Sequence, residues 1–258
     1  MLEGLAGRTA LVTGAAAGIG AATCRRLHRE GSNIVAVDRD QTGLKQLAAD
    51  LGERVVTVVA DVTDEEETKG FFDTAVQEFG SVDMFHANAG LDPGVVSVHD
   101  LEMGDFDRVF AVNVRGAFLG ARAAVRQMTT QSTGGKIVFT SSISGLKGDA
   151  GVAVYAASKH AVNGLAKALA KETGQLGIRV NVVCPGPVST AMMDRLEVGL
   201  GTLVGADAEG VRSALATVIP MGRYGEADEI AATVAWLLSD EVPFMHGEIV
   251  TVGGGLYP

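Results

Sequence analysis

Seven short apolar runs, rich in β-branched residues, recur along the chain with Gly, Asn, Asp or Pro near their ends. Runs of this length and composition are typical of buried strands. The predicted strands cover residues 9–13, 33–37, 55–59, 82–86, 136–140, 179–183 and 248–252.

Longer segments between these runs carry apolar residues at three- and four-residue spacing, which indicates helices with one buried face. The predicted helices cover residues 21–30, 43–51, 65–79, 106–128, 154–173 and 226–238. A capping box formed by Thr63 and Glu66 is predicted to open the third of them. Because strands and helices alternate regularly, the expected fold is α/β, with a doubly wound parallel sheet of about seven strands covered by helices on both faces.

The stretch at residues 191–219 interrupts this alternation. Its apolar periodicity is weak, it contains glycines at 199, 201, 205 and 210, and it begins with the adjacent Met192 and Met193. We interpret it as a mobile substrate flap. With no linker or internal repeat, residues 1–258 are expected to form one domain.

Composition and charge argue against several classes of function. The formal net charge is -10 and no Lys/Arg run offsets it, which disfavours nucleic acid and anionic membranes as partners. No apolar stretch reaches the roughly 18 residues that a membrane span needs, and residues 1–7 lack the pattern of a secretion signal. A cytoplasmic protein is therefore expected. Two cysteines, Cys24 and Cys184, and scattered histidines have no metal-ligand spacing, so no metal site is expected.

The first predicted strand runs into a glycine-rich turn, in which Gly14, Gly18 and Gly20 are followed by a helix. Glycines at this junction allow the backbone to approach a pyrophosphate, whose charge meets the helix N-terminus. The second strand ends at Asp38, whose carboxylate would accept hydrogen bonds from the adenosine ribose. NAD (NADH) is therefore the predicted cofactor. NADP is less favoured because its 2'-phosphate would face Asp38, although the adjacent Arg39 is an opposing signal that we expect to point away.

Tyr155 and Lys159 lie four residues apart in the predicted helix 154–173, so they share one helix face. A nearby cation favours the phenolate, so Lys159 would lower the pKa of Tyr155 and suit it to general acid/base catalysis. Taken alone, the pair fits a solvated helix face equally well. The surrounding motifs decide between these interpretations.

Further motifs follow in a fixed order along nearly the whole chain. They are TGAAAGIG at 13–20, Asp61-Val62, Asn88-Ala89-Gly90, Asn113, Ser141-Ser142, YAASK at 155–159 and PGPVST at 185–190. In this combination the chain resembles the compact single-domain branch of the short-chain dehydrogenase/reductase family. The resemblance implies a Rossmann-type fold and an oxidoreductase that interconverts a secondary alcohol and a ketone by hydride transfer.

The same resemblance assigns four catalytic roles. Tyr155 resembles the general acid/base, and Lys159 the group that lowers its pKa while binding the nicotinamide ribose. Ser142 would hold the substrate oxygen, and we prefer it to Ser141 because the family's serine lies thirteen residues before the tyrosine. Asn113 resembles an anchor for a water that connects the lysine to solvent, or else it is a helix-kinking residue with a satisfied amide.

A larger set of residues would bind the cofactor by this resemblance. Asp61 and Val62 would flank the adenine, although Asp61 also fits a helix cap, and Val188 with Thr190 would bind the carboxamide. The full set is Gly14, Gly18, Ile19, Gly20, Asp38, Arg39, Asp61, Val62, Asn88, Ala89, Gly90, Tyr155, Lys159, Pro185, Gly186, Val188 and Thr190. The family also implies a homotetramer, an inference weakened by Gly253, which stands where relatives commonly have Asp.

The substrate pocket is expected to be mostly apolar, with no cation placed to bind a carboxylate or phosphate. Its predicted residues are Ser142, Ser144, Leu146, Tyr155, Pro187, Met192 and Met193, with Leu91 at the boundary. A lipophilic secondary alcohol or cyclic ketone is the small-molecule partner that fits this lining best. The two methionines could equally form the core of the flap.

Three alternatives remain on the sequence alone. One is a non-catalytic NAD sensor or scaffold with the same fold, and another is an NADP-linked reductase of the ketoacyl type. The third is an epimerase or dehydratase that holds NAD tightly. The spacing of Gly14, Gly18 and Gly20 and the lack of a large C-terminal substrate domain argue against this third class.

Overall fold

Seven parallel strands form one sheet in the computed structural model, which describes residues 1–257. The spatial order is β3-β2-β1-β4-β5-β6-β7. The strands are β1 (Thr9–Thr13), β2 (Asn33–Asp38), β3 (Val55–Val59), β4 (Met84–Ala87), β5 (Gly135–Thr140), β6 (Ile178–Pro185) and β7 (Ile249–Val252). The order reverses between β1 and β4, and a reversal of this kind opens a crevice at the carboxyl ends of the strands.

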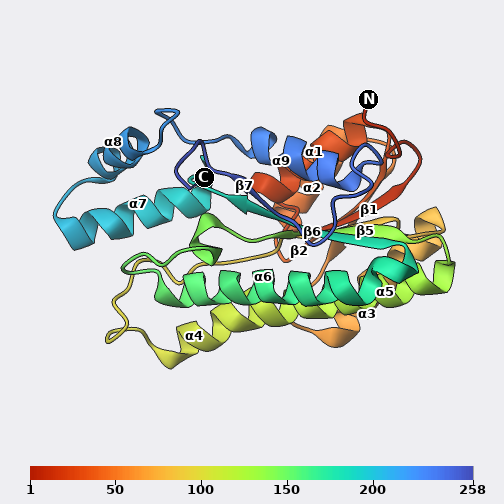
Figure 1. The fold of residues 1–258 in the computed structure, drawn as a ribbon, viewed down its shortest axis with the longest axis horizontal. Coiled ribbons are helices and arrows are strands. Elements are labelled where there is room, and N and C mark those ends of the chain that lie inside the picture. Colours follow the sequence, from red (N-terminus) through yellow and green to blue (C-terminus); the bar gives the residue numbers. More distant parts are fainter. Residues whose placement is uncertain (258) are drawn as a thin grey trace.

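Helices cover both faces of the sheet (Figure 1). One face carries α1 (Gly18–Arg29), α2 (Gln41–Leu51) and α9 (Ala227–Leu238), and the other carries α3 (Glu65–Phe79), α4 (Met103–Phe110), α5 (Ala117–Gln131) and α6 (Ala153–Thr173). Each layer encloses its own apolar core, because successive strand residues point to opposite faces. On β2, for example, Val35 and Val37 join one core while Ile34 and Ala36 join the other. The doubly wound fold predicted from the sequence is confirmed.

The long helix predicted at 106–128 is interrupted in the structure. Between α4 and α5 the backbone forms a π-helix, η1 (Ala111–Gly116), which has Asn113 at its centre. Such wide turns insert an extra residue into a helix and occur frequently at functional sites. The repeat of apolar residues continues across the insertion, so sequence periodicity predicts one continuous helix.

The capping box predicted for the start of α3 is wrong. The N-cap is Asp64, whose carboxylate accepts hydrogen bonds from the N–H groups of Glu66 and Glu67. Asp64 directly precedes the first helical residue, and an N-cap must lie there to reach these orphan donors. The N–H of Thr63 is instead bound by the Asp61 carboxylate at 2.9 Å.

Residues 191–219, expected to form a flap of weak periodicity, contain two helices, α7 (Ala191–Val204) and α8 (Ala208–Val218). The α7–α8 segment projects beyond one end of the sheet (Figure 1). Gly205 ends α7 in the left-handed conformation, with φ of 72°, and Asp207 caps α8. The glycines that suggested a loop therefore include a helix stop, while mobility of this segment stays a prediction. Within residues 1–257, no helix has the length and apolar character needed to cross a bilayer.

Candidate active site

A cavity of about 710 Å³ lies at the carboxyl ends of the central strands. Gly14, Asn88, Ser142 and Gly186, which follow β1, β4, β5 and β6, all line it. The predicted site residues that line it are Gly14, Gly18, Ile19, Asp38, Asn88, Gly90, Ser142, Ser144, Tyr155, Lys159, Pro185, Gly186, Pro187, Val188, Thr190, Met192 and Met193. The fold thus brings most of the predicted cofactor, catalytic and substrate residues to one cavity.

The glycine-rich turn is packed too tightly for side chains. Gly14 has φ of +66°, and a Cβ there would lie 2.9 Å from the Cα of Ala89. A Cβ on Gly20 would lie 2.0 Å from the carbonyl oxygen of Gly14. Only glycine fits at these two positions, so the backbone of the turn stays free of side chains there.

The N-terminus of α1 faces this cavity with Gly18 and Ile19. Its N-cap, Ala17, makes no side-chain cap hydrogen bond, and the first turn has no acidic residue. Free N–H groups and the positive end of the helix dipole therefore suit an anion such as a pyrophosphate. Together with the glycine cradle and Asp38 at the rim, these residues fit a nicotinamide dinucleotide.

Asp38 and Arg39 diverge at the end of β2, as the alternation of strand residues predicts. Asp38 lines the cavity, and its carboxylate accepts hydrogen bonds from the N–H groups of Ala16 and Asp40, both at 3.0 Å. Arg39 is exposed and lies outside the lining. The pKa of Asp61 is lowered, chiefly by the N–H of Thr63 and in small part by the charge of Arg39.

Several predicted cofactor residues do not line the cavity. They are Gly20, Arg39, Asp61, Val62 and Ala89. The N–H of Ala89 donates to the Thr13 hydroxyl at 3.1 Å, and Val62 packs against the backbone of Gly116 in η1. Direct cofactor contact by these residues stays a prediction.

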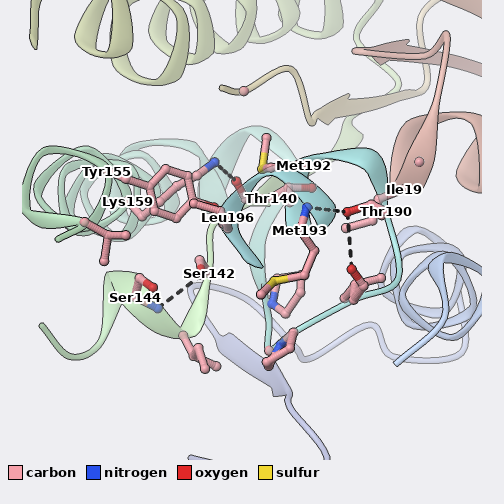
Figure 2. Close-up of a pocket in the computed structure, with 18 of the residues that line it drawn as sticks. Ile19, Thr140, Ser142, Ser144, Tyr155, Lys159, Thr190, Met192, Met193 and Leu196 are labelled. Carbon is pink, nitrogen blue, oxygen red and sulfur yellow. Dashed lines mark hydrogen bonds between the residues drawn. The ribbon is translucent and has the colours of Figure 1, made fainter. Parts of the chain in front are cut away.

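Ser142, Tyr155 and Lys159 lie together in the cavity (Figure 2). Ser142 follows β5, and its Oγ accepts a hydrogen bond from the Ser144 N–H at 3.1 Å. Lys159 is 4% exposed, donates to the Thr140 carbonyl at 3.0 Å, and holds its Nζ 5.6 Å from the Tyr155 ring centroid. Ser141 also lines the cavity, and its hydroxyl donates to the carbonyl of Lys159 at 3.1 Å, so the choice of Ser142 as the substrate-binding serine stays a prediction.

Burial dominates the ionisation of the tyrosine and the lysine. It raises the pKa of Tyr155 to about 12, an effect that a hydrogen bond with Ser142 opposes and the charge of Asp92 reinforces. Burial also lowers the pKa of Lys159 to about 8. The pKa of Tyr155 thus moves opposite to the direction expected from the nearby ammonium, because the loss of solvation is the largest effect. Tyr155 is protonated at neutral pH.

Asn113 is a structural clamp in η1. Its side-chain Oδ1 accepts from the Leu91 N–H at 2.8 Å, and its Nδ2 donates to the Leu91 carbonyl and to Ser158 Oγ at 2.9 and 3.0 Å. The amide is therefore satisfied by the protein, as the second interpretation of this residue expects. A role for Asn113 in holding a water stays a prediction.

The substrate side of the cavity includes apolar residues that the sequence analysis missed. Leu196 and Leu200 follow Met192 at four-residue spacing along α7, so helical periodicity in this segment would have revealed them. Leu215, Val218 and Leu256 also line the cavity. Leu146, predicted as a pocket residue, packs instead against the core beneath α5 and α6.

The cavity was predicted to have no cation placed to bind a carboxylate or phosphate, and this prediction is wrong. Lys147 and Arg195 both line the cavity. Each has a carboxylate partner, with Lys147 3.0 Å from Asp149 and Arg195 3.4 Å from Asp92. The Arg195 side chain is 61% exposed, whereas that of Asp92 is 2% exposed. The lining is therefore apolar with ion pairs at its edge.

Comparison with known proteins finds relatives that span the whole chain. The family described as Enoyl-(Acyl carrier protein) reductase matches residues 14–257. A cis-4-hydroxycyclohexanecarboxylate dehydrogenase from Sinomonas cyclohexanicum is 37% identical, covering 99% of this chain and 98% of the relative. A 3-oxoacyl-(acyl-carrier-protein) reductase from Thermotoga maritima is 35% identical over 98% of both chains. The crystal structure of NAD+-bound xylitol dehydrogenase aligns with a TM-score of 0.94 at 36% identity, covering 98% of this chain and all of that one.

Proposed function

Because the chain belongs to the short-chain dehydrogenase/reductase family, we propose that it is an NAD(H)-dependent oxidoreductase that interconverts a secondary alcohol and a ketone. One observation carries the proposal: a single cavity is lined by the glycine-rich turn, by α7, and by Ser142, Tyr155 and Lys159. The preference for NAD is supported by Asp38, which lines the cavity while Arg39 does not. The NAD+ in the related xylitol dehydrogenase structure agrees with this preference.

When bound, the nicotinamide supplies a hydride for reduction and accepts one in oxidation. Tyr155 provides the accompanying proton. Its pKa of about 12 keeps the phenol protonated at neutral pH, so in reduction it donates to the carbonyl oxygen of the substrate. In oxidation the phenolate oxygen of Tyr155 takes the proton from the alcohol.

Ser142 and Lys159 prepare the site for this proton transfer. Ser142 Oγ accepts the Ser144 N–H, so its hydroxyl hydrogen is left to donate, and it exchanges its bond with Tyr155 for one to the substrate oxygen as charge develops there. The Thr140 carbonyl holds Lys159, whose ammonium stabilises the phenolate that forms when Tyr155 gives up its proton. The pKa of about 8 keeps Lys159 mainly charged at neutral pH.

The substrate class we propose is lipophilic or cyclic. Met192, Leu196 and Leu200 give the cavity an apolar wall along α7. Such a wall accommodates a hydrocarbon ring and contributes through the area that it removes from water. The substrate in the name of the Sinomonas relative is a ring alcohol and agrees with the cyclic part of this proposal, but it also carries a carboxylate.

A second candidate is an NADP-linked reductase of the ketoacyl type. Lys147 and Arg195 at the edge of the cavity favour it, since they could pair with an anionic group of an acyl carrier. The Thermotoga relative is named for such an activity. Both cations already have carboxylate partners, and for this reason we place this candidate second.

The test is oxidation of NADH and of NADPH, followed at the nicotinamide absorbance, with a panel of cyclic ketones, steroids, aryl ketones, β-keto esters and an acetoacetyl thioester. Turnover of a cyclic or lipophilic ketone with NADH supports the proposal. Turnover of the thioester alone with NADPH supports the second candidate. Tight NADH binding without turnover of any substrate would favour the non-catalytic sensor.

A further inference from the structure

A histidine that takes no part in this mechanism lies in the sheet beneath the cavity. His86 is on β4 and is 1% exposed. Its Nε2 lies 2.7 Å from Thr140 Oγ1, while Nδ1 has no hydrogen-bond partner within residues 1–257. Burial lowers the pKa of His86 to about 3, so the ring is neutral at ordinary pH and carries one N–H.

The neighbours of Thr140 determine which nitrogen carries that hydrogen. Asn88 Nδ2 lies 3.0 and 3.2 Å from the carbonyl oxygens of Thr13 and Gly14, which only accept, so the other end of this amide is the oxygen. Thr140 Oγ1 lies 3.1 Å from Asn88 Oδ1 and must donate its single hydrogen there. The hydroxyl is then an acceptor toward the imidazole. The hydrogen is therefore on Nε2 of His86.

The result is a directed chain of hydrogen bonds from the core to the cofactor turn, running from His86 through Thr140 and Asn88 to the carbonyl of Gly14. A Cβ on Gly14 would lie 3.0 Å from Asn88 Nδ2, so the amide and the turn are in close contact. The backbone carbonyl of Thr140 also accepts the bond from Lys159. One core residue thus fixes a threonine that serves both the turn and the catalytic lysine.

We propose that His86, as its neutral Nε2–H tautomer, is a positioning residue that holds Thr140 and Asn88 in the orientation that cofactor binding requires. An apolar side chain of similar size would fill the same space but would leave Thr140 Oγ1 without its donor. In a buried network each member orients the next, so the loss spreads toward the turn. The lone pair left on Nδ1 costs less than a buried N–H without an acceptor would.

The tautomer is tested first, on the wild-type protein without cofactor, by the ¹⁵N chemical shifts of the His86 ring. We expect a protonated Nε2 and a bare Nδ1, unchanged throughout the neutral pH range. A protonated Nδ1, or a charged ring, would overturn the proposal. This measurement is independent of the proposed enzymatic activity.

The positioning role is tested by NADH titration of His86→Leu, His86→Gln and Thr140→Val, followed by nicotinamide fluorescence. Loss of one buried hydrogen bond should weaken NADH binding about five- to tenfold in His86→Leu. His86→Gln, whose amide retains a donor near the position of Nε2, should recover most of that loss. In the double variant His86→Leu/Thr140→Val, the histidine substitution should add nothing to the effect of Thr140→Val.

Phe139→Leu is the matched control, because Phe139 is fully buried on β5 but lies outside the chain of hydrogen bonds. It should lower the melting temperature without weakening NADH binding. Equal NADH affinities of His86→Gln and His86→Leu, or additive losses in the double variant, would reduce His86 to a packing residue. The inference rests on the proposed cofactor use in this second test alone, and a wild-type protein that binds no NADH would refute that use while leaving the tautomer result standing.

Discussion

The glycine-rich turn and the α7–α8 segment form two walls of one cavity, yet different interactions hold them. The turn is fixed by part-buried hydrogen bonds, such as those from Asn88 to the carbonyls of Thr13 and Gly14. The α7–α8 segment leaves large apolar side chains exposed, including Val204 at 66% and Val218 at 60%.

An ionic contact joins the two helices of the α7–α8 segment. Arg212 on α8 lies 3.3 Å from the nearly buried Glu197 on α7, and its guanidinium stacks over the Tyr224 ring. Burial raises the pKa of Tyr224 well above its usual range. Elements with few apolar contacts open at lower free energy than the core does. The comparison indicates that the cofactor wall tolerates little change, whereas the substrate wall can vary.

The largest effect is expected at Tyr155, which lines the same cavity as the two walls. Tyr155→Phe removes the proton donor and keeps the ring, so kcat should fall about a thousandfold. NADH binding should stay largely intact, because the glycine turn and α1 are untouched. Steady-state kinetics and NADH titration measure the two quantities, and turnover near the wild-type rate would refute the assignment of Tyr155.

A pair of glycine substitutions compares the walls directly. In Gly20→Ala the new Cβ would lie 2.0 Å from the Gly14 carbonyl oxygen, so the turn must move, at a cost of about 1–3 kcal/mol in unfolding free energy and with loss of NADH binding. In Gly199→Ala on α7 the Cβ meets the side chain of Val95 at 3.0 Å, and the gain in helix propensity of about 1 kcal/mol offsets the contact.

Urea unfolding and NADH titration of both variants provide the comparison. Gly199→Ala should retain NADH affinity and alter only the KM for the ketone. If it lost NADH binding as completely as Gly20→Ala, the distinction between a fixed and an adaptable wall would fail.

Cofactor choice should change by a smaller factor. Asp38→Asn removes the carboxylate charge at nearly constant size, so the ratio of NADPH to NADH affinity should rise about tenfold, equivalent to roughly 1.4 kcal/mol of relieved repulsion. Arg39→Gln is the control and should leave the ratio unchanged, because Arg39 lies outside the cavity. A large loss of NADPH affinity in Arg39→Gln would mean that Arg39 reaches the cofactor.

The last prediction concerns Lys159 and the pH dependence of the unfolding free energy. Burial lowers the folded-state pKa of Lys159 to about 8, below its usual value of 10.5. Between these values the unfolded chain binds a proton that the folded protein has released, so this group makes the unfolding free energy rise with pH by at most about 1.4 kcal/mol per pH unit. Tyr155, with its pKa raised from 10.0 to about 12, has the opposite effect above pH 10.

Urea unfolding at a series of pH values from 8 to 10, with Lys159→Met as the control, isolates the contribution of the lysine. The slope should be shallower in the variant. An unchanged slope would show that Lys159 keeps an ordinary pKa in the folded protein.

Sequence reasoning succeeded where the evidence is local. The buried runs predicted each strand to within a few residues, because alternation and β-branching reflect burial directly. The positions of Gly14, Asp38 and Tyr155 followed from the strand or helix on which each lies.

Prediction from the sequence failed where distant segments meet or where the helix geometry changes. The extra residue at Asn113 leaves the apolar repeat intact, so η1 is invisible in the pattern. Lys147, Arg195 and Leu256 reach the cavity through packing of three separate segments, which no local signal encodes. The glycines of α7 were taken as loop signals, although a Cβ on Gly201 would lie 2.5 Å from the carbonyl of Ala206, which shows that this helix packs closely against the turn that follows it.

Leu256 lines the cavity although it lies far along the chain from the other lining residues. Its side chain lines the cavity, its N–H donates to the Gly253 carbonyl at 3.0 Å, and the hydroxyl of the next residue, Tyr257, donates to Leu146 at 3.5 Å. A mutant library that varies only these last codons would therefore reshape substrate selectivity without disturbing the sheet.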